Sequence, residues 1–221
     1  MMKNIVIFGT GAVAAELTSY LEDGCWGRDS GYSIKGYLAS DENGDKNWKH
    51  YGLKQPFLGS LDNYDCQRND YFVVAVGNSK VKRNIAECIK SKGGNFISLI
   101  HPTAIIAASA IIGEGNIIYP SCVIGPNVKI NDFNLFTSQS AISHDTVIGS
   151  YNFFATALLC GYNNVGDDNY FGIKVTTLPE IHVGSRNIIQ AGMIIDRSIQ
   201  DDSTLFYRYK EKILAIPKTE E

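Results

Sequence analysis

The sequence predicts an α/β domain followed by a parallel β-helix built from hexapeptide repeats. Over the first hundred residues, short apolar strands alternate with helical segments, which is typical of a parallel sheet covered by helices. From residue 100 onward an apolar residue recurs at every sixth position, and a fixed period of this kind indicates a repeat architecture. We therefore expect a domain over residues 1–99, a β-helix over 100–200 and a C-terminal tail over 201–221.

Strands and helices alternate along the first of these segments. One predicted helix begins at Ser79 as its N-cap and ends at Gly93 and Gly94. Its apolar residues have helical spacing and predict one buried face, formed by Val81, Ile85, Cys88 and Ile89. The other expected elements are a helix over 12–23, strands over 4–9, 32–39, 71–78 and 95–100, and a polar loop over 41–55.

The repeat can be divided into seventeen units, of which sixteen have six residues and one, Cys160–Asn164, has five. The first residue is aliphatic or aromatic except in the units that begin at Cys160 and Thr177. Neither the 3.6 period of a helix nor the 2.0 period of a strand explains this spacing. A coil with three short sides does, because each first residue then points inward and stacks on neighbouring coils. Asparagines at fifth positions are expected to hydrogen-bond along the stack: Asn116, Asn134, Asn152, Asn169 and Asn187.

Composition and charge exclude several function classes. The formal net charge of −3 provides no basic surface for nucleic acid or an anionic membrane. No apolar run approaches the roughly 18 residues of a membrane-spanning helix. The five cysteines are scattered, and neither they nor the four histidines have metal-ligand spacing. We therefore expect free thiols in a reducing cytoplasm and no bound metal.

Four segments carry a resemblance to a known family: IVIFGTGAVAAEL, AVGNSKVKRNIAECI, LIHPTA and SHDTVIGSYNF. With the repeat, they resemble the sugar acetyltransferases of the sialic acid O-acetyltransferase and bacillosamine-pathway N-acetyltransferase type. The resemblance implies a Rossmann-like acceptor-binding domain, a left-handed β-helix, acetyl-CoA as co-substrate and a homotrimer with active sites between subunits. It also implies transfer of an acetyl group to a nucleotide-linked amino sugar or a related sugar.

His144 and Asp145 are the candidate catalytic pair. His144 lies two residues after the inward Ile142, so its side chain is expected to face out of the coil. A solvated surface histidine is the plain alternative. A histidine can however accept the proton that an acceptor loses as it attacks a thioester, and a neighbouring carboxylate can orient the ring. The resemblance implies this role for both residues.

The resemblance also implies the ligand contacts. It assigns acetyl-CoA to Phe153, Gly161, Ile173 and Ala191, with Gly161 near the thioester oxygen. In the first domain, GTGAVA follows a strand and precedes a helix, as a phosphate-binding loop does. It is weak as a dinucleotide fingerprint, because the acid expected about twenty residues on should end the second strand, and that strand instead ends in Ala39, Ser40 and Asp41. The acceptor residues that the resemblance implies are Gly11, Ala12, Val13, Ser40, Asp41, Gly77 and Asn78.

The sequence leaves alternatives open. The acceptor could be a sialic acid-type sugar that is O-acetylated, and the chain could be a non-catalytic scaffold derived from such an enzyme. A nicotinamide oxidoreductase is the third reading, although it leaves the β-helix without a task. Large side chains outside the inward positions predict partner subunits about a threefold axis. These are Phe133, Tyr151, Phe153 and Tyr170.

Overall fold

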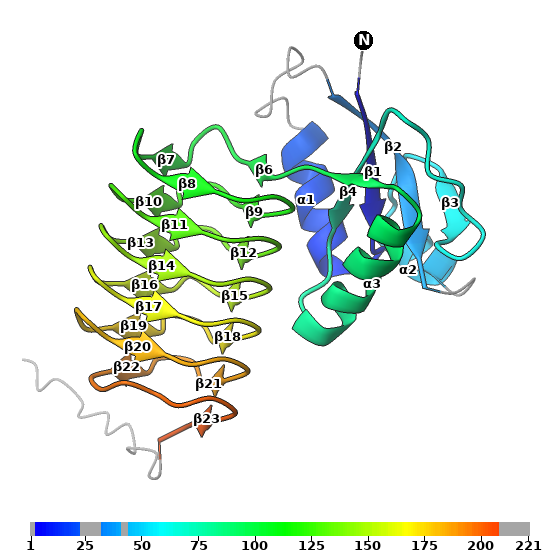
Figure 1. Ribbon diagram of the computed structural model, residues 1–221. Helices are drawn as coiled ribbons and strands as arrows, with labels where there is room; N and C mark the ends of the chain where they lie inside the picture. Colours follow the sequence, from blue (N-terminus) through cyan, green and yellow to red (C-terminus); the bar gives the residue numbers. More distant parts are fainter. Residues whose placement is uncertain (1–2, 23–31, 41–43, 208–221) are drawn as a thin grey trace, which may run out of the picture.

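The computed structural model of the chain describes residues 3–22, 32–40 and 44–207, which form an α/β domain beside a left-handed parallel β-helix (Figure 1). The predicted fold class is confirmed. The α/β domain has a five-stranded parallel sheet in the order β3-β2-β1-β4-β5. Its strands are β1 (Lys3–Phe8), β2 (Tyr32–Ala39), β3 (Phe57–Ser60), β4 (Asp70–Val74) and β5 (Asn95–Phe96), and its helices are α1 (Ala12–Glu22), α2 (Gly44–His50) and α3 (Ser79–Ser91).

The expectations for segments 41–55 and 95–100 of this domain were wrong. The stretch 41–55, expected to be a loop, contains the short helix α2, and β3 follows it at the sheet edge. The single strand expected over 95–100 is two strands in different sheets, since β5 pairs with β4 while β6 (Leu99–Ile100) begins the β-helix. Both segments are short and their apolar residues lack a clear period. Their secondary structure therefore depends on the parts of the fold that they pack against.

Helix α3 is buried on two sides. Ile85 and Ile89 pack against the sheet as expected, whereas Val81, expected on that face, is 43% exposed. Lys82 and Ala86 are buried instead, because a second surface, the β-helix, covers them. The N-cap is Asn78 rather than Ser79: its Oδ1 accepts a hydrogen bond from the Val81 N–H at 3.0 Å.

The β-helix has three flat faces made of two-residue strands that pair in parallel from coil to coil. Face 1 contains β6, β9 (Ile117–Ile118), β12 (Leu135–Phe136), β15 (Phe153–Phe154), β18 (Tyr170–Phe171), β21 (Ile188–Ile189) and β23 (Thr204–Leu205). Face 2 contains β7 (Ile105–Ile106), β10 (Val123–Ile124), β13 (Ala141–Ile142), β16 (Leu158–Leu159), β19 (Thr176–Thr177) and β22 (Ile194–Ile195). Face 3 contains β8 (Ile111–Ile112), β11 (Lys129–Ile130), β14 (Val147–Ile148), β17 (Asn164–Val165) and β20 (His182–Val183).

The interior follows the predicted pattern. The second residue of each strand points inward and joins one continuous core, which includes Ile118, Phe136, Phe154 and Phe171 at 0% exposure. The asparagine ladder is present: each Oδ1 from Asn116 to Asn169 accepts the backbone N–H of the asparagine in the next coil. Because buried amides need partners, this ladder fixes the coil spacing as well as the hydrophobic stack does.

The position of the short unit was wrong. Phe154 and Leu159 are successive inward residues, so the five-residue unit is 154–158 and not Cys160–Asn164. Two adjacent leucines made the choice ambiguous, since either could lead a unit. A four-residue unit also ends the repeat, because Ile199 follows Ile195 inside the core and bridges Val183. Strand stacking continues to β23, beyond residue 200, and residues 208–221 lie outside the described residues.

The α/β domain packs on the upper coils of face 1 (Figure 1). Leu99, Ile117 and Leu135 share a core cluster with residues of the first domain. Phe133 and Tyr151, which we expected to need partner subunits, are buried beneath α3 at 1% and 8% exposure. Of the other two, Phe153 is half-buried and Tyr170 is 45% exposed.

Among the described residues, no helix combines the length and the apolar character required to cross a membrane.

Candidate functional site

His144 lies in the turn between β13 and β14, at the edge where faces 2 and 3 meet. The inward Ile142 is 1% exposed, and the His144 side chain is 52% exposed, so the ring faces outward as predicted. Its Nδ1 lies 2.9 Å from Oδ2 of Asp145. If Nδ1 carries the proton, that carboxylate holds the ring in the tautomer that leaves Nε2 free as a base.

Asp145 is held in place from the coil above. It occupies a left-handed corner with φ of 56°, and its Oδ1 accepts a hydrogen bond from Nδ2 of Asn127 at 3.0 Å. The Asn127 amide and then His144 lower the pKa of Asp145 below its ordinary value. The carboxylate is therefore ionised at neutral pH and available to the ring. The sequence analysis missed Asn127, although its spacing of 18 residues from Asp145 matches the length of one full coil.

Gly161 lies directly against the imidazole. A Cβ at this position would be 2.7 Å from Cε1 and 2.8 Å from Nε2 of His144, so glycine alone leaves room for the ring. Residue 161 is buried, and its N–H has no hydrogen-bond partner within the described part of the chain. A free backbone N–H beside a candidate base is the kind of group that stabilises an oxyanion.

Tyr162 completes the surroundings of His144. The two rings are edge-to-face, with centroids 5.1 Å apart and an interplanar angle of 88°. The Tyr162 N–H donates to the carbonyl oxygen of His144 at 3.1 Å, which ties the two turns together. The sequence did not predict this contact, because it depends on the true position of the short unit.

The glycine loop lines a separate cavity of about 560 Å³ at the carboxyl ends of β1, β2 and β4. This is where open parallel sheets bind ligands. Gly11, Ala12, Val13, Ser40 and Gly77 all line it, and no charged side chain of the described residues does. Asn78 lines the adjoining cavity at the start of α3 instead. Asp41 lies outside the described residues.

The residues assigned to acetyl-CoA divide between several places. Ile173 and Ala191 line one cavity of about 600 Å³ on the lower coils, with Tyr207 at its rim. Phe153 lines a cavity of about 720 Å³ beneath the start of α3, where its ring stacks on that of Tyr170. Gly161 lies with His144 at the edge where faces 2 and 3 meet. The cavities of about 600 Å³ and 720 Å³ share Tyr170 and Ile188. The cavity of about 720 Å³ also shares Gly77 with the glycine-loop cavity.

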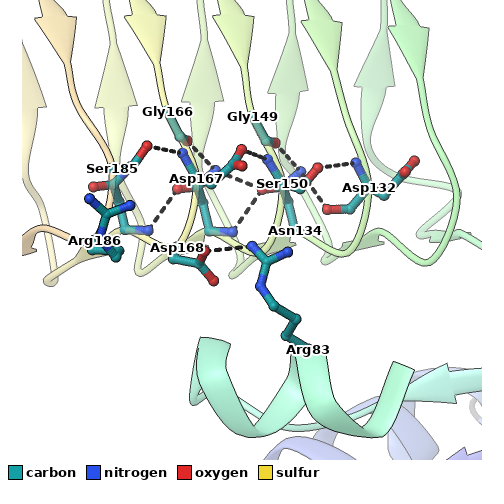
Figure 2. A network of polar contacts seen from close by, with 12 residues as sticks. Arg83, Asp132, Asn134, Gly149, Ser150, Gly166, Asp167, Asp168, Ser185 and Arg186 are labelled. Carbon is teal, nitrogen blue, oxygen red and sulfur yellow. Dashed lines mark hydrogen bonds and ion pairs between the residues drawn. The ribbon is translucent and has the colours of Figure 1, made fainter. Parts of the chain in front are cut away.

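A network of charged and polar residues fixes α3 beside these cavities (Figure 2). Arg83 donates to Asp168 at 2.5 Å, and its guanidinium lies over the ring of Tyr151. Behind Asp168, alternating aspartate and serine side chains accept hydrogen bonds from backbone N–H groups of neighbouring coils; for example, the Ser150 N–H donates to Asp167 Oδ1 at 2.7 Å. The coils at the floor of the cavity of about 720 Å³ are therefore connected by hydrogen bonds.

The candidate site residues of one chain form two separate groups. The α/β domain covers face 1, whereas His144 lies at the edge between faces 2 and 3, which does not border face 1. The glycine-loop cavity and His144 therefore lie on opposite sides of the same β-helix. Within the described residues there is no cluster of three His, Cys, Asp or Glu side chains that could hold a metal ion.

Comparison with known proteins supports the fold over nearly the whole chain. PerB from Caulobacter crescentus, in complex with CoA and GDP-perosamine, superposes with a TM-score of 0.77 at 18% identity, covering 92% of this chain and 94% of that one. The acetyltransferase domain of PglB from Neisseria gonorrhoeae, in complex with acetyl coenzyme A, gives 0.74 at 23% identity, covering 92% and 96%.

The sequence similarity is more local. A stretch of 46 residues is 48% identical to UDP-N-acetylbacillosamine N-acetyltransferase from Bacillus subtilis strain 168, and it spans 21% of each protein. The chain thus matches about a fifth of the length of this curated relative. No protein-family model matches the chain.

Proposed function

We propose that this protein is an acetyl-CoA-dependent acetyltransferase that acts on a nucleotide-linked amino sugar, with His144 as general base. The observation that carries this proposal is the local geometry at one edge of the β-helix. An ionised Asp145 holds His144, and Gly161, whose N–H has no hydrogen-bond partner among the described residues, lies against the same ring. Base, orienting carboxylate and oxyanion donor are the groups that acyl transfer requires.

The reaction follows from these positions. Nε2 of His144 accepts a proton from the acceptor amine as the amine nitrogen attacks the thioester carbonyl carbon. The carbonyl oxygen becomes an oxyanion, which accepts a hydrogen bond from the Gly161 N–H. When the tetrahedral intermediate collapses, the carbon–sulfur bond breaks and the imidazolium returns its proton to the CoA thiolate. Asp145 stabilises the imidazolium between these steps.

The glycine-loop cavity is the acceptor site in this proposal. Backbone N–H groups at the start of α1 favour phosphate, and the cavity volume suits a nucleotide. The structural relative bound to GDP-perosamine and the sequence relative named for a UDP-sugar agree with a nucleotide-linked amino sugar. Ile173 and Ala191, in the lower cavity, are the proposed acetyl-CoA contacts, and acetyl-CoA is bound to the second structural relative.

Because one chain separates these groups, we further propose that the working unit is a trimer in which His144 of one subunit faces the acceptor cavity of the next. Faces 2 and 3 carry exposed apolar side chains that a monomer would leave in water. On face 2 these are Ile105, Val123, Leu158 and Ile194, and on face 3 they are Ile111 and Val147.

The test is acetyl transfer by the purified protein. UDP- and GDP-linked amino sugars, free amino sugars and sialic acid are each incubated with acetyl-CoA, and thiol release is followed. We expect transfer to a nucleotide-linked amine, and His144→Gln should lower kcat by about 10²–10⁴-fold, the usual contribution of a general base. The melting temperature should not change, because the side chain is exposed.

Comparison with an Asp145 variant provides the control for the His144 substitution. Asp145→Asn should reduce kcat less than His144→Gln does, since it removes the orienting charge and keeps the ring. A His144→Gln variant that retained more than about a third of wild-type kcat would exclude His144 as the base, and transfer to sialic acid alone would replace N-acetylation by O-acetylation.

A further inference from the structure

Tyr162 is an exposed aromatic residue that the proposed chemistry does not use. Three left-handed corners of the β-helix carry aromatic side chains among the described residues: Phe133, Tyr151 and Tyr162. Phe133 and Tyr151 are buried beneath α3, whereas Tyr162 is 58% exposed. A bulky residue in this backbone conformation costs on the order of 1 kcal/mol. Packing against α3 explains why aromatic side chains occupy the corners at Phe133 and Tyr151, but it does not explain the one at Tyr162.

The contact of Tyr162 is with the candidate base. Its ring is edge-to-face with the imidazole at a centroid distance of 5.1 Å, and its N–H donates to the His144 carbonyl oxygen. Asp145 fixes the imidazole at Nδ1 only, which leaves the ring free to tilt about that hydrogen bond. Gly161, on the neighbouring coil, presents no side chain to limit this motion. The Tyr162 ring is the large group that does.

We propose that Tyr162 is a positioning residue whose ring holds the imidazole of His144 with Nε2 beside the Gly161 N–H. The inference rests on the proposed function, because it names a residue that acts through the proposed base. The aromatic ring is the part that matters: no hydrogen bond to the Tyr162 hydroxyl occurs among the described residues. A phenylalanine should therefore replace the tyrosine, and an aliphatic residue should not.

Kinetics of two variants test this role. Tyr162→Phe should keep kcat within about 2-fold of wild type. Tyr162→Leu should lower kcat by about 10–100-fold with KM for acetyl-CoA unchanged, since a small misplacement of a catalytic group can cost that much. The matched control is Tyr51→Leu. Tyr51 is also exposed, at 42%, and packs edge-to-face on a histidine, His50, at 4.8 Å, but it lies in the first domain.

An NMR measurement separates this inference from the proposed function. Histidine ring resonances of the full chain are assigned with His144→Gln as the reference. In wild type and Tyr162→Phe, the Cε1–H of His144 should show a ring-current shift and the Nδ1-protonated tautomer should dominate. In Tyr162→Leu the shift should disappear and both tautomers should be populated. This measurement needs no substrate, so it stands even where no acceptor is acetylated.

Two results would overturn the inference. A tautomer ratio of His144 in Tyr162→Leu equal to that of wild type would show that the ring contact does not hold the imidazole. A loss of kcat in Tyr162→Phe equal to that in Tyr162→Leu would assign the effect to the hydroxyl group instead of the ring.

Discussion

His144 depends on residues from three successive coils. Asn127 holds Asp145 from one coil, Asp145 holds the ring within its own turn, and Gly161 leaves space for the ring on the next coil. All three interactions arise at the same edge, so the stacking of coils, which stabilises the fold, also orients the proposed base. An arrangement on rigid turns limits the motion of a catalytic group more than a free loop would.

Gly161→Ala should remove activity without unfolding the protein. The added methyl group would lie within 2.8 Å of the His144 ring, and the exposed ring can rotate away at little cost to the fold. We expect kcat to fall by about 10²-fold or more, because the base leaves its position. Steady-state kinetics and a thermal melt check both parts.

The double variant provides the control for that change. His144→Gln combined with Gly161→Ala should be no slower than His144→Gln alone, since both substitutions remove the same interaction. Fully additive losses would contradict the account and give Gly161 a role that does not involve the ring.

At this scale the sequence allowed the prediction that His144 faces out of the coil beside Asp145, whereas the catalytic roles of both stay predictions. It did not allow the prediction of Asn127 or Tyr162 as neighbours of the pair. Contacts between coils depend on the number of residues in each coil, and the short unit at 154–158 changes the spacing from 18 residues to 17.

At the scale of elements, α3 determines how the α/β domain sits on the β-helix. Lys82 of this helix is 2% exposed, and its Nζ donates to the carbonyl oxygen of Phe133 at 3.0 Å. Burial lowers the pKa of Lys82 to about 7 from its ordinary value of 10.5, and the charge of Asp168 opposes that shift only in part. An ammonium group is therefore disfavoured at this interface.

The stability of the protein should depend on pH through Lys82. Between pH of about 7 and 10.5 the unfolded chain binds more protons than the folded one, so stability rises with pH through this window. Below pH 7 the full penalty remains, about 5 kcal/mol for a pKa that falls from 10.5 to about 7. We expect Lys82→Met to be more stable than wild type at pH 6.5 and to lose most of that advantage at pH 9.5.

Urea unfolding of both proteins at the two pH values measures this difference. Comparing the variant with wild type cancels the contribution of the other titrating groups, provided that both unfold in the same steps. A stability difference that does not change with pH would show that Lys82 keeps its ordinary pKa in the fold.

The asparagine ladder offers a second test at this scale. Asn152 donates from Nδ2 to Asn134 Oδ1 and to the Gly166 carbonyl, and its Oδ1 accepts the Asn169 N–H. Asn152→Ala leaves the Gly166 carbonyl and the Asn169 N–H unpaired, whereas Asn134 Oδ1 keeps the backbone N–H of residue 152, and it should cost about 3 kcal/mol or more. Asn187→Ala, at the end of the ladder, should cost less, because its Nδ2 already lacks a partner.

Thermal melts of the two variants compare these costs directly. Equal decreases in melting temperature would contradict the claim that ladder hydrogen bonds, and not only the volume of the side chain, stabilise the coils. The ladder was predictable from asparagines at fifth positions. The α2 helix and the buried Lys82 were not, because each depends on a surface from elsewhere in the chain.

At the scale of the whole molecule, the α/β domain and the β-helix were predictable because their sequence periods differ. The way they pack was not. Phe133 and Tyr151 were correctly read as side chains that need cover, but α3 of the same chain covers them. A repeat pattern predicts which side chains face out of the coil, but it does not predict which surface packs against them.

The central claim is that the reaction occurs between the His144 edge of one subunit and the glycine-loop cavity of another. Two variants, each expected to be inactive, test it when co-expressed with different tags. His144→Ala removes the proposed base, and Gly11→Phe fills the acceptor cavity, because a Cβ at this position has no other atom within 4 Å and the ring can extend into the cavity. Assemblies that contain both chains are then purified through both tags.

In a cyclic trimer with both chain types, one of the three interfaces combines an intact base with an intact cavity. We therefore expect the purified mixed assembly, at about three times the 24.3 kDa chain mass, to recover about one third of the wild-type activity. Mixed assemblies as inactive as either parent, or a monomer with full activity, would contradict the account.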